Sequence, residues 1–146
     1  MTIAREVREP GGALIYAAPP GAPLRRVVSK ETAAAVTTMM EHTVSEGTSY
    51  RAFRDASGAP FLPGVSVAGK TGTLSEGDHL YTWFTGFAPS RTVPGVRPVA
   101  IAVLVVNHPT WRLKANVVAR EMLRAYFAAQ NVEHVPRASL GVVARK

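Results

Sequence analysis

The sequence predicts an α/β (α+β) domain with an antiparallel sheet of at least three strands flanked by helices. Residues 30–46 and 113–130 repeat apolar side chains every three or four positions, which is typical of helices with one buried side. Three other segments are rich in the β-branched, aromatic and small residues that favour strands. These segments are 65–73, 80–88 and 99–106. A turn at residues 75–78 predicts that the first two strands pair antiparallel.

The composition is that of one globular domain, or a piece of one. The chain has 146 residues, of which 47% are hydrophobic, and its mean hydropathy is +0.06. Its 17 lysines and arginines against 10 acidic residues give a formal net charge of +7. The basic residues are scattered and lack the aromatic interleaving of single-strand-binding surfaces. We therefore expect a solvated basic surface and no nucleic-acid partner.

The residue types present predict neither a cofactor nor a metal site. The chain contains no cysteine, which excludes disulfides and thiolate ligands. Its four histidines are far apart in the sequence, so we expect each to lie singly on the surface or in a loop. They are His42, His79, His108 and His134. No stretch is apolar enough to span a membrane, and the charged residues 1–10 do not form an export signal.

The N-terminal third predicts a hairpin followed by a helix. Residues 3–8 and 13–17 flank Pro10-Gly11-Gly12, which favours a short hairpin. Ser29 is the expected N-cap of the helix and Gly47 its expected stop. One apolar stripe consists of Ala33, Val36, Met40 and Val44. We expect this stripe, with the methionines at positions 39 and 40, to fill the core.

The C-terminal half predicts the remaining strands and the second helix. Residues 55–58 are expected to form a turn. Because residues 99–106 are apolar without alternation, we expect this strand to be covered on both faces, with the two helices supplying the layers. The stripe expected to face the core from the second helix is Val118, Met122, Ala125, Tyr126 and Ala129, with Asn131 as the stop. Residues 131–146 are interpreted as a basic tail that follows a domain segment at 1–130.

The end of the strand at residues 65–73 carries the chemistry that indicates binding. Lys70 supplies a positive charge, and Thr71 and Thr73 supply hydroxyl donors. Gly72 has no side chain to hold a second chain away. Because side chains alternate along a strand, Lys70 and Gly72 point to one side and the threonines to the other. Such a strand edge suits an extended peptide that ends in a carboxylate.

The same stretch satisfies a nucleotide-binding pattern, which gives a distant alternative. Residues 64–71 read GxxxxGK(S/T), the loop that cradles phosphates. That loop needs an apolar strand before it and a helix after it. Here Pro60 and Pro63 precede the loop, and residues 72–78 indicate a strand end and a turn.

Four landmarks occur in an order that resembles a known family. They are Glu46-Gly47-Thr48 at a helix end, Ala68-Gly69-Lys70-Thr71-Gly72-Thr73, Trp83-Phe84-Thr85-Gly86-Phe87-Ala88-Pro89, and an apolar strand followed by a C-terminal helix. This order resembles the C-terminal part of the penicillin-binding protein transpeptidase domain, and most closely the class B peptidoglycan D,D-transpeptidases. The similarity covers residues 3–128 and implies the C-terminal half of the fold shared with serine β-lactamases.

The resemblance implies roles for single residues. Lys70, Thr71 and Gly72 match the family's Lys-Thr-Gly on the strand that lines the active-site cleft. There the lysine supplies positive potential to the proton-relay network, and the threonine hydroxyl binds the carboxylate of a D-Ala-D-Ala stem peptide or of a β-lactam. Thr73 matches the residue whose backbone N–H forms half of the oxyanion hole.

The chain departs from the family at the nucleophile. No serine has a lysine three residues later or an asparagine two residues later, so the Ser-x-x-Lys and Ser-x-Asn motifs are absent. We therefore expect an enzyme segment that is inactive alone and needs the N-terminal half of the domain. A non-catalytic module that binds peptidoglycan stems or another envelope partner is the alternative. Only the resemblance implies a cell-envelope location, with any membrane anchor outside this sequence.

Overall fold

The computed structural model describes residues 6–17, 26–108 and 113–130. The chain divides into two units, Met1–Ala33 and Ala34–Lys146, and each is described by itself. The interpreted tail at 131–146, which includes the expected stop at Asn131 and also His134, lies outside the described residues. None of the described helices is long and apolar enough to cross a membrane.

The first unit contains the predicted hairpin. Strand β1 (Glu6–Arg8) pairs antiparallel with β2 (Leu14–Ala17). The Arg8 guanidinium donates to the Gly12 carbonyl at 2.9 Å, and Gly12 adopts a positive φ of 87° that suits a residue without a side chain. The hairpin prediction is confirmed for the residues that the structure describes.

Helix α1 (Lys30–Ser45) starts as predicted but buries less than predicted. The Thr32 backbone N–H donates to Ser29 Oγ at 3.1 Å, so Ser29 is the N-cap. The expected core stripe is wrong for most of its length, because Val44 is the buried residue of this helix and Val36 is 46% exposed. Met39 is 64% exposed and is not core filler. Only the C-terminal part of α1 packs against the core.

A connector leads from α1 to the sheet. It begins with the short 3-10 helix η1 (Tyr50–Ala52) and continues through the predicted turn. The Asp55 carboxylate accepts the backbone N–H groups of Ser57 and Ala59, each at 2.9 Å. The Ser57 hydroxyl also donates to this carboxylate, at 2.7 Å. This hydroxyl is the largest contributor, and together the hydrogen bonds lower the pKa of Asp55. The prediction of a turn at residues 55–58 is confirmed.

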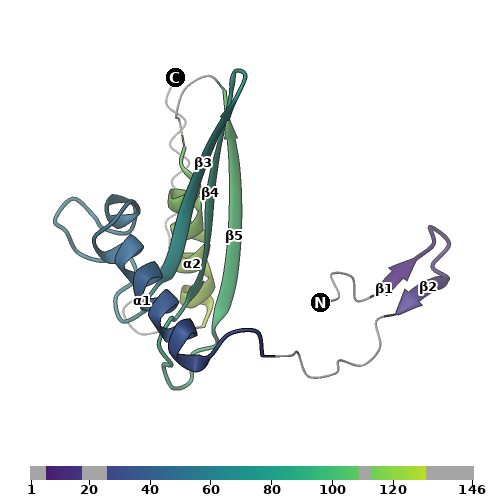
Figure 1. The fold of residues 1–146 in the computed structure, drawn as a ribbon, viewed down its shortest axis with the longest axis horizontal. Coiled ribbons are helices and arrows are strands. Elements are labelled where there is room, and N and C mark those ends of the chain that lie inside the picture. Colours follow the sequence, from purple (N-terminus) through teal and green to yellow (C-terminus); the bar gives the residue numbers. More distant parts are fainter. Residues whose placement is uncertain (1–5, 18–25, 109–112, 131–146) are drawn as a thin grey trace. The chain divides into compact units, whose positions relative to one another are not determined.

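The sheet has three antiparallel strands, which agrees with the prediction of at least three, and their order is β3-β4-β5 (Figure 1). They are β3 (Ala68–Glu76), β4 (His79–Ala88) and β5 (Val99–Asn107). Strand β3 starts three residues later than predicted, because Ser66 bonds to the loop after β4 instead of joining the ladder. The turn between β3 and β4 is also shorter than predicted and consists of Gly77 and Asp78.

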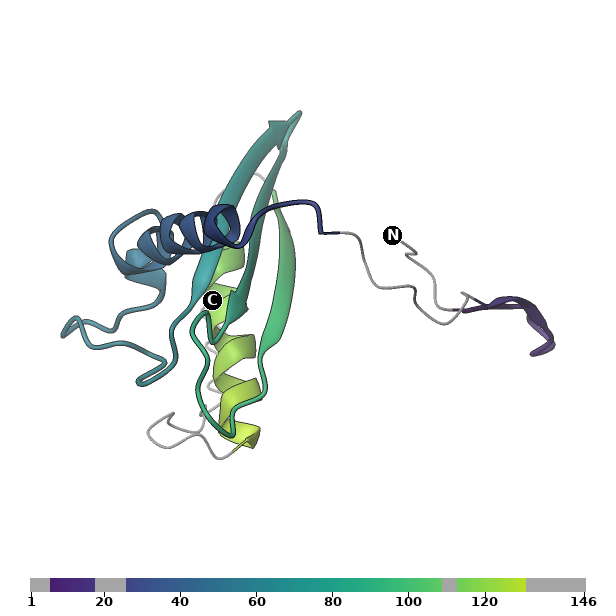
Figure 2. The ribbon, with the colours of Figure 1, turned by 60° about the horizontal axis from the view of Figure 1, so that its bottom comes forward.

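Helix α2 (Ala115–Ala129) packs along one face of β4 and β5 (Figure 2). The residues that it buries are Ala115, Asn116, Ala119, Leu123 and Phe127. The predicted stripe is therefore wrong at three positions, since Met122 is 51% exposed and Ala125 and Ala129 are exposed, whereas Val118 and Tyr126 are partly buried against the core. Apolar residues surround this helix on several sides, and the large pair Leu123 and Phe127 determines which side packs.

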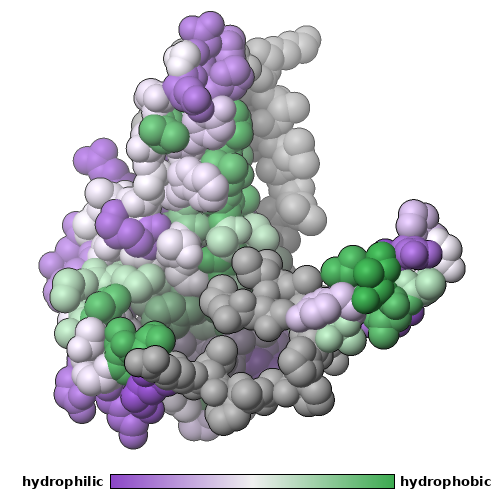
Figure 3. Space-filling model, turned by 45° about the vertical axis from the view of Figure 1, so that its right-hand side comes forward, coloured by the Kyte–Doolittle hydropathy of each residue, from purple (hydrophilic) through white to green (hydrophobic). Residues whose placement is uncertain are grey.

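The opposite face of the sheet is not covered by the described residues. Leu104 and Val106 of β5 are 44% and 50% exposed. Trp83 is the register partner of Leu104, and Tyr81 pairs with Val106 on one side and with the exposed Leu74 on the other. Figure 3 shows hydrophobic residues at the surface over this part of the molecule. The prediction that β5 is covered on both faces is wrong, because α2 packs on one face only and α1 lies on the β3 side of the sheet (Figure 1).

Candidate functional site

The predicted binding residues lie on an open edge of the sheet. Strand β3 is an outer strand, and β4 is its only neighbour among the described strands. In an antiparallel ladder, every second residue directs its backbone N–H and C=O away from the partner strand. A two-residue turn closes on the hydrogen-bonded pair Glu76 and His79, so by this alternation Thr71 and Thr73 direct their backbone groups to the open edge.

The side chains along this edge are accessible. Lys70 and Thr73 are exposed, and Thr71 and Gly72 are partly exposed. The Lys70 ammonium donates to the Thr71 carbonyl at 2.7 Å, so the positive charge lies along the strand edge. A Cβ atom added to Gly72 would lie 3.5 Å from Trp83 Cβ, which is an ordinary contact distance. Glycine is therefore not needed here to avoid a clash, but its lack of a side chain leaves space along the strand edge.

The residue before Lys70 fixes the strand to the core. A Cβ atom on Gly69 would lie 2.2 Å from Cζ of the fully buried Phe84. No side chain fits there without moving the ring, so glycine is required for this close approach. The position of Lys70 and Thr71 therefore depends on the packing of Phe84 beneath the strand.

A cavity of about 250 Å³ adjoins this strand edge. Its lining residues come from β3, from β4, from the turn after α1 and from the start of α2. They are Thr48, Thr71, Gly72, Thr73, Thr82, Trp83, Lys114, Ala115 and Asn116. Thr48 Oγ1 lies 2.8 Å from Thr71 Oγ1, within hydrogen-bond distance. Its hydroxyl and amide groups can form hydrogen bonds, so the cavity is suited to a small polar group.

Besides Thr71 and Thr73, four polar residues line the cavity that were not predicted as site residues from the sequence: Thr48, Thr82, Lys114 and Asn116. Thr48 belongs to the Glu46-Gly47-Thr48 landmark, which was the available signal. The other three residues carry no local pattern that would identify them. The pairing of β4 with β3 places Thr82 opposite Thr73, and the folding of α2 against β4 brings Lys114 and Asn116 beside β3.

Hydrogen bonds fix the start of α2 beside the cavity. The Ala115 backbone N–H donates to Thr82 Oγ1 at 3.2 Å, and Asn116 Nδ2 donates to Ser49 Oγ at 3.2 Å. Asn107 at the end of β5 accepts from the Leu113 N–H at 3.3 Å and donates to its carbonyl at 3.0 Å. The start of α2 is therefore bound to β4, to β5 and to the turn after α1.

The geometry argues against the nucleotide-binding alternative. Lys70 and Thr71 lie inside β3, which continues to Glu76 and turns into β4. A phosphate loop would instead place these two residues at the N-terminus of a helix, where backbone N–H groups gather around the phosphates.

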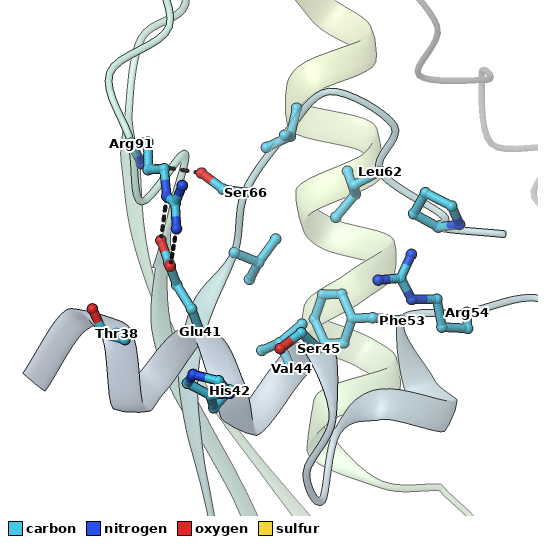
Figure 4. A pocket seen from close by; sticks show the side chains of 13 residues that line it. Thr38, Glu41, His42, Val44, Ser45, Phe53, Arg54, Leu62, Ser66 and Arg91 are labelled. Carbon is cyan, nitrogen blue, oxygen red and sulfur yellow. Dashed lines mark hydrogen bonds and ion pairs between the residues drawn. The ribbon is translucent and has the colours of Figure 1, made fainter. Parts of the chain in front are cut away.

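A second cavity, of about 400 Å³, lies between α1 and the connector (Figure 4). At its edge the Glu41 carboxylate accepts from Arg91 Nη2 at 2.9 Å and from the Ser90 hydroxyl at 2.6 Å. These contacts, with Arg91 as the larger contributor, lower the pKa of Glu41. The Arg91 N–H also donates to Ser66 Oγ at 3.0 Å. This network holds Ser66, in the segment just before β3, in place. Residues 70–73 do not line this cavity.

Two histidines that are far apart in the sequence are close in the structure. The rings of His79 and His108 lie 5.1 Å apart, because the pairing of β4 with β5 places the start of one strand beside the end of the other. The expectation that each histidine lies singly is therefore wrong for this pair. Within the described ranges, no three histidine, aspartate or glutamate side chains are grouped as a metal site requires.

Comparisons with known proteins agree with this architecture. A family model described as the penicillin binding protein transpeptidase domain matches residues 3–126. A solved structure, the D,D-transpeptidase domain of a peptidoglycan glycosyltransferase from Eggerthella lenta, is similar with a TM-score of 0.55 and 28% sequence identity. The similarity covers 87% of this chain and 27% of that chain. No curated protein is significantly similar to the chain.

Proposed function

The chain belongs to the penicillin-binding protein transpeptidase domain family, and we propose that it is the part of a D,D-transpeptidase that binds the carboxylate of the substrate. The ligand would be a peptidoglycan stem peptide ending in D-Ala-D-Ala, or a β-lactam that imitates it. Members of this family act on the cell wall, which implies a location in the cell envelope.

One observation carries the proposal: Lys70, Thr71 and Thr73 lie on an open strand edge beside a cavity. An extended peptide can add to such an edge through backbone hydrogen bonds. The Lys70 ammonium and the Thr71 hydroxyl are suited to the terminal carboxylate, since hydrogen bonds to a charged group are stronger than neutral ones. Gly72 leaves room for the peptide backbone.

We assign the Thr73 backbone N–H to half of an oxyanion hole. By the alternation of the ladder, this N–H is directed to the open edge and is available to an incoming carbonyl oxygen. One oxyanion donor typically contributes about 3 kcal/mol to the stabilisation of a transition state. The second donor and the attacking serine would come from residues outside this sequence, which contains neither Ser-x-x-Lys nor Ser-x-Asn.

Binding of a short peptide tests the carboxylate site. We expect the 146-residue chain to bind a peptide ending in D-Ala-D-Ala and to lose about tenfold or more in affinity on Thr71→Val, because a hydrogen bond to a charged group is removed. Thr38→Val is the matched control, since the Thr38 hydroxyl bonds to the Ala34 carbonyl within α1. Titration by NMR would measure both affinities. Equal affinity in the Thr71→Val variant and the natural chain would contradict the assignment.

Covalent labelling tests the expectation that this chain cannot acylate. We expect no adduct when the chain is incubated with a fluorescent penicillin and examined by mass spectrometry, because the sequence lacks the family's nucleophile motif. A stable adduct on any serine of the chain would contradict the proposal of an incomplete catalytic site.

A further inference from the structure

We propose that Thr48 is a positioning residue for Thr71: its hydroxyl donates to Thr71 Oγ1 and thereby directs the Thr71 proton toward a ligand carboxylate. The two oxygens lie 2.8 Å apart, although the residues are 23 positions apart in the sequence. Both residues line the cavity at the strand edge. This inference rests on the proposed function, since it concerns the same carboxylate.

The direction of the hydrogen bond follows from counting protons. A threonine hydroxyl has one proton to donate and can accept two hydrogen bonds. If Thr71 donated to Thr48, it would have no proton left for a carboxylate, which can only accept. If Thr48 donates, Thr71 keeps its proton for the ligand. A bound carboxylate therefore selects the arrangement in which Thr48 donates to Thr71, and successive hydrogen bonds of this kind strengthen each other.

The turn that carries Thr48 is held in place independently of the ligand. The Gly47 N–H donates to the His42 carbonyl at 2.8 Å, and the Ser49 N–H donates to the Thr43 carbonyl at 3.0 Å. A Cβ atom on Gly47 would lie 3.0 Å from Thr43 Cα, so the turn is tight. Both neighbours of Thr48 in the chain are therefore fixed to the end of α1.

The same turn is connected by hydrogen bonds to the start of α2 and, through it, to the sheet that contains β3. Ser49 is fully buried, and its Oγ accepts from Asn116 Nδ2 at the start of α2. Beside it, the Ala115 N–H donates to Thr82 Oγ1 on β4. Thr82 is the register partner of Thr73 on β3. The turn and the strand edge thus belong to one connected set of contacts, which fixes the separation of the two hydroxyls.

The first test is a double-mutant cycle with the D-Ala-D-Ala peptide. Thr48→Val removes the hydroxyl and keeps the size of the side chain, and we expect it to lower the affinity about three- to tenfold. Thr48→Ser retains the hydroxyl and should restore affinity to within about twofold of the natural chain. In a Thr71→Val background, Thr48→Val should have no further effect, because its partner is gone. The loss should also be absent for a peptide whose C-terminus is an amide.

The second test needs no ligand. Three-bond NMR couplings from Thr71 Cγ2 to the backbone report whether χ1 occupies one staggered rotamer. We expect a single rotamer in the natural chain and in Thr48→Ser, and averaging between rotamers in Thr48→Val. Thr38→Val, which removes a hydroxyl bonded within α1, is the control and should leave the Thr71 couplings unchanged.

The outcomes separate the two proposals. If Thr71→Val lowers the affinity for the carboxylate peptide but Thr48→Val changes neither affinity nor the Thr71 rotamer, the role of Thr48 is overturned and the carboxylate site stands. If Thr71→Val has no effect, or the chain does not bind the peptide, the proposed function fails. The couplings then still decide whether Thr48 positions Thr71, and an averaged Thr71 rotamer in the natural chain would overturn that inference.

Discussion

The two faces of the β3-β4-β5 sheet differ sharply, although the same strands form both. On one face, Phe84 of β4 packs in the core that α2 covers, and it is fully buried. Leu123 and Phe127 of α2, which belong to the same core, are at most 1% exposed. On the other face, Trp83 and Leu104 are 47% and 44% exposed. Trp83 and Phe84 are neighbours in β4, so alternation alone separates a core residue from a surface one. One face stabilises the fold, and the described residues leave the other face open.

The largest effect should come from the covered face. We expect Phe127→Ala to lower the free energy of unfolding by about 3–5 kcal/mol, because a fully buried ring is replaced by a cavity. Met122→Ala on the exposed side of the same helix should cost much less. Urea denaturation followed by circular dichroism measures both values. Similar losses for the two variants would contradict the assigned orientation of α2.

Two glycines of β3 give the next largest contrast. Gly69→Ala should lower the free energy of unfolding by about 1–3 kcal/mol, because its Cβ would overlap the Phe84 ring. Gly72→Ala, which meets Trp83 at ordinary contact distance, should change stability by less than about 0.5 kcal/mol. Thermal unfolding of the two variants provides the comparison. A harmless Gly69→Ala would show that β3 does not lie against Phe84 as described.

Ser90 and Arg91 donate hydrogen bonds to Glu41 outside both faces of the sheet. Removing the Glu41 carboxylate tests whether these polar contacts add stability. Because the pKa of Glu41 is lowered in the folded chain, its contribution is present above the unfolded pKa of about 4.3 and is lost as the pH falls through the folded value. We expect Glu41→Gln to cost about 1 kcal/mol at pH 7 and to flatten the pH dependence below about pH 5. Stability curves at several pH values measure this, with Glu76→Gln at an exposed position of β3 as control. Unchanged curves would contradict a role for the network.

The smallest effect on stability should come from the open face. Leu104→Thr should change the free energy of unfolding by no more than about 0.5 kcal/mol, whereas Val103→Thr, whose side chain is 8% exposed, should cost about 1–2 kcal/mol. We also expect Leu104→Thr to reduce self-association at high protein concentration, since it removes apolar surface beside an outer strand. Light scattering during gel filtration tests that part. A large loss of stability in Leu104→Thr would mean that this face is covered.

The order and type of the elements could be predicted from the sequence because their signals are local. Ser29 and Gly47 bracket α1, and the short turn after β3 is punctuated by Gly77. Which side of each helix packs against the core could not be predicted as well. In α2 several apolar stripes compete, and only packing against β4 and β5 selects the one with Leu123 and Phe127.

The candidate site was predicted in part for the same reason. Lys70 to Thr73 form a continuous motif on one strand, so the sequence alone identifies them. Thr48 and Asn116 reach the same cavity from the end of one helix and the start of another. Their proximity to Thr71 depends on contacts between residues that are far apart in the sequence, and no single local pattern encodes those contacts.

The close approach of Phe84 to Gly69 has a practical consequence. The ring lies beneath the residue next to Lys70 and is shielded from water. A fluorine atom placed on this ring would be sensitive to small displacements of β3. Its NMR signal could therefore report when a ligand settles on the strand edge, without any label on the ligand itself.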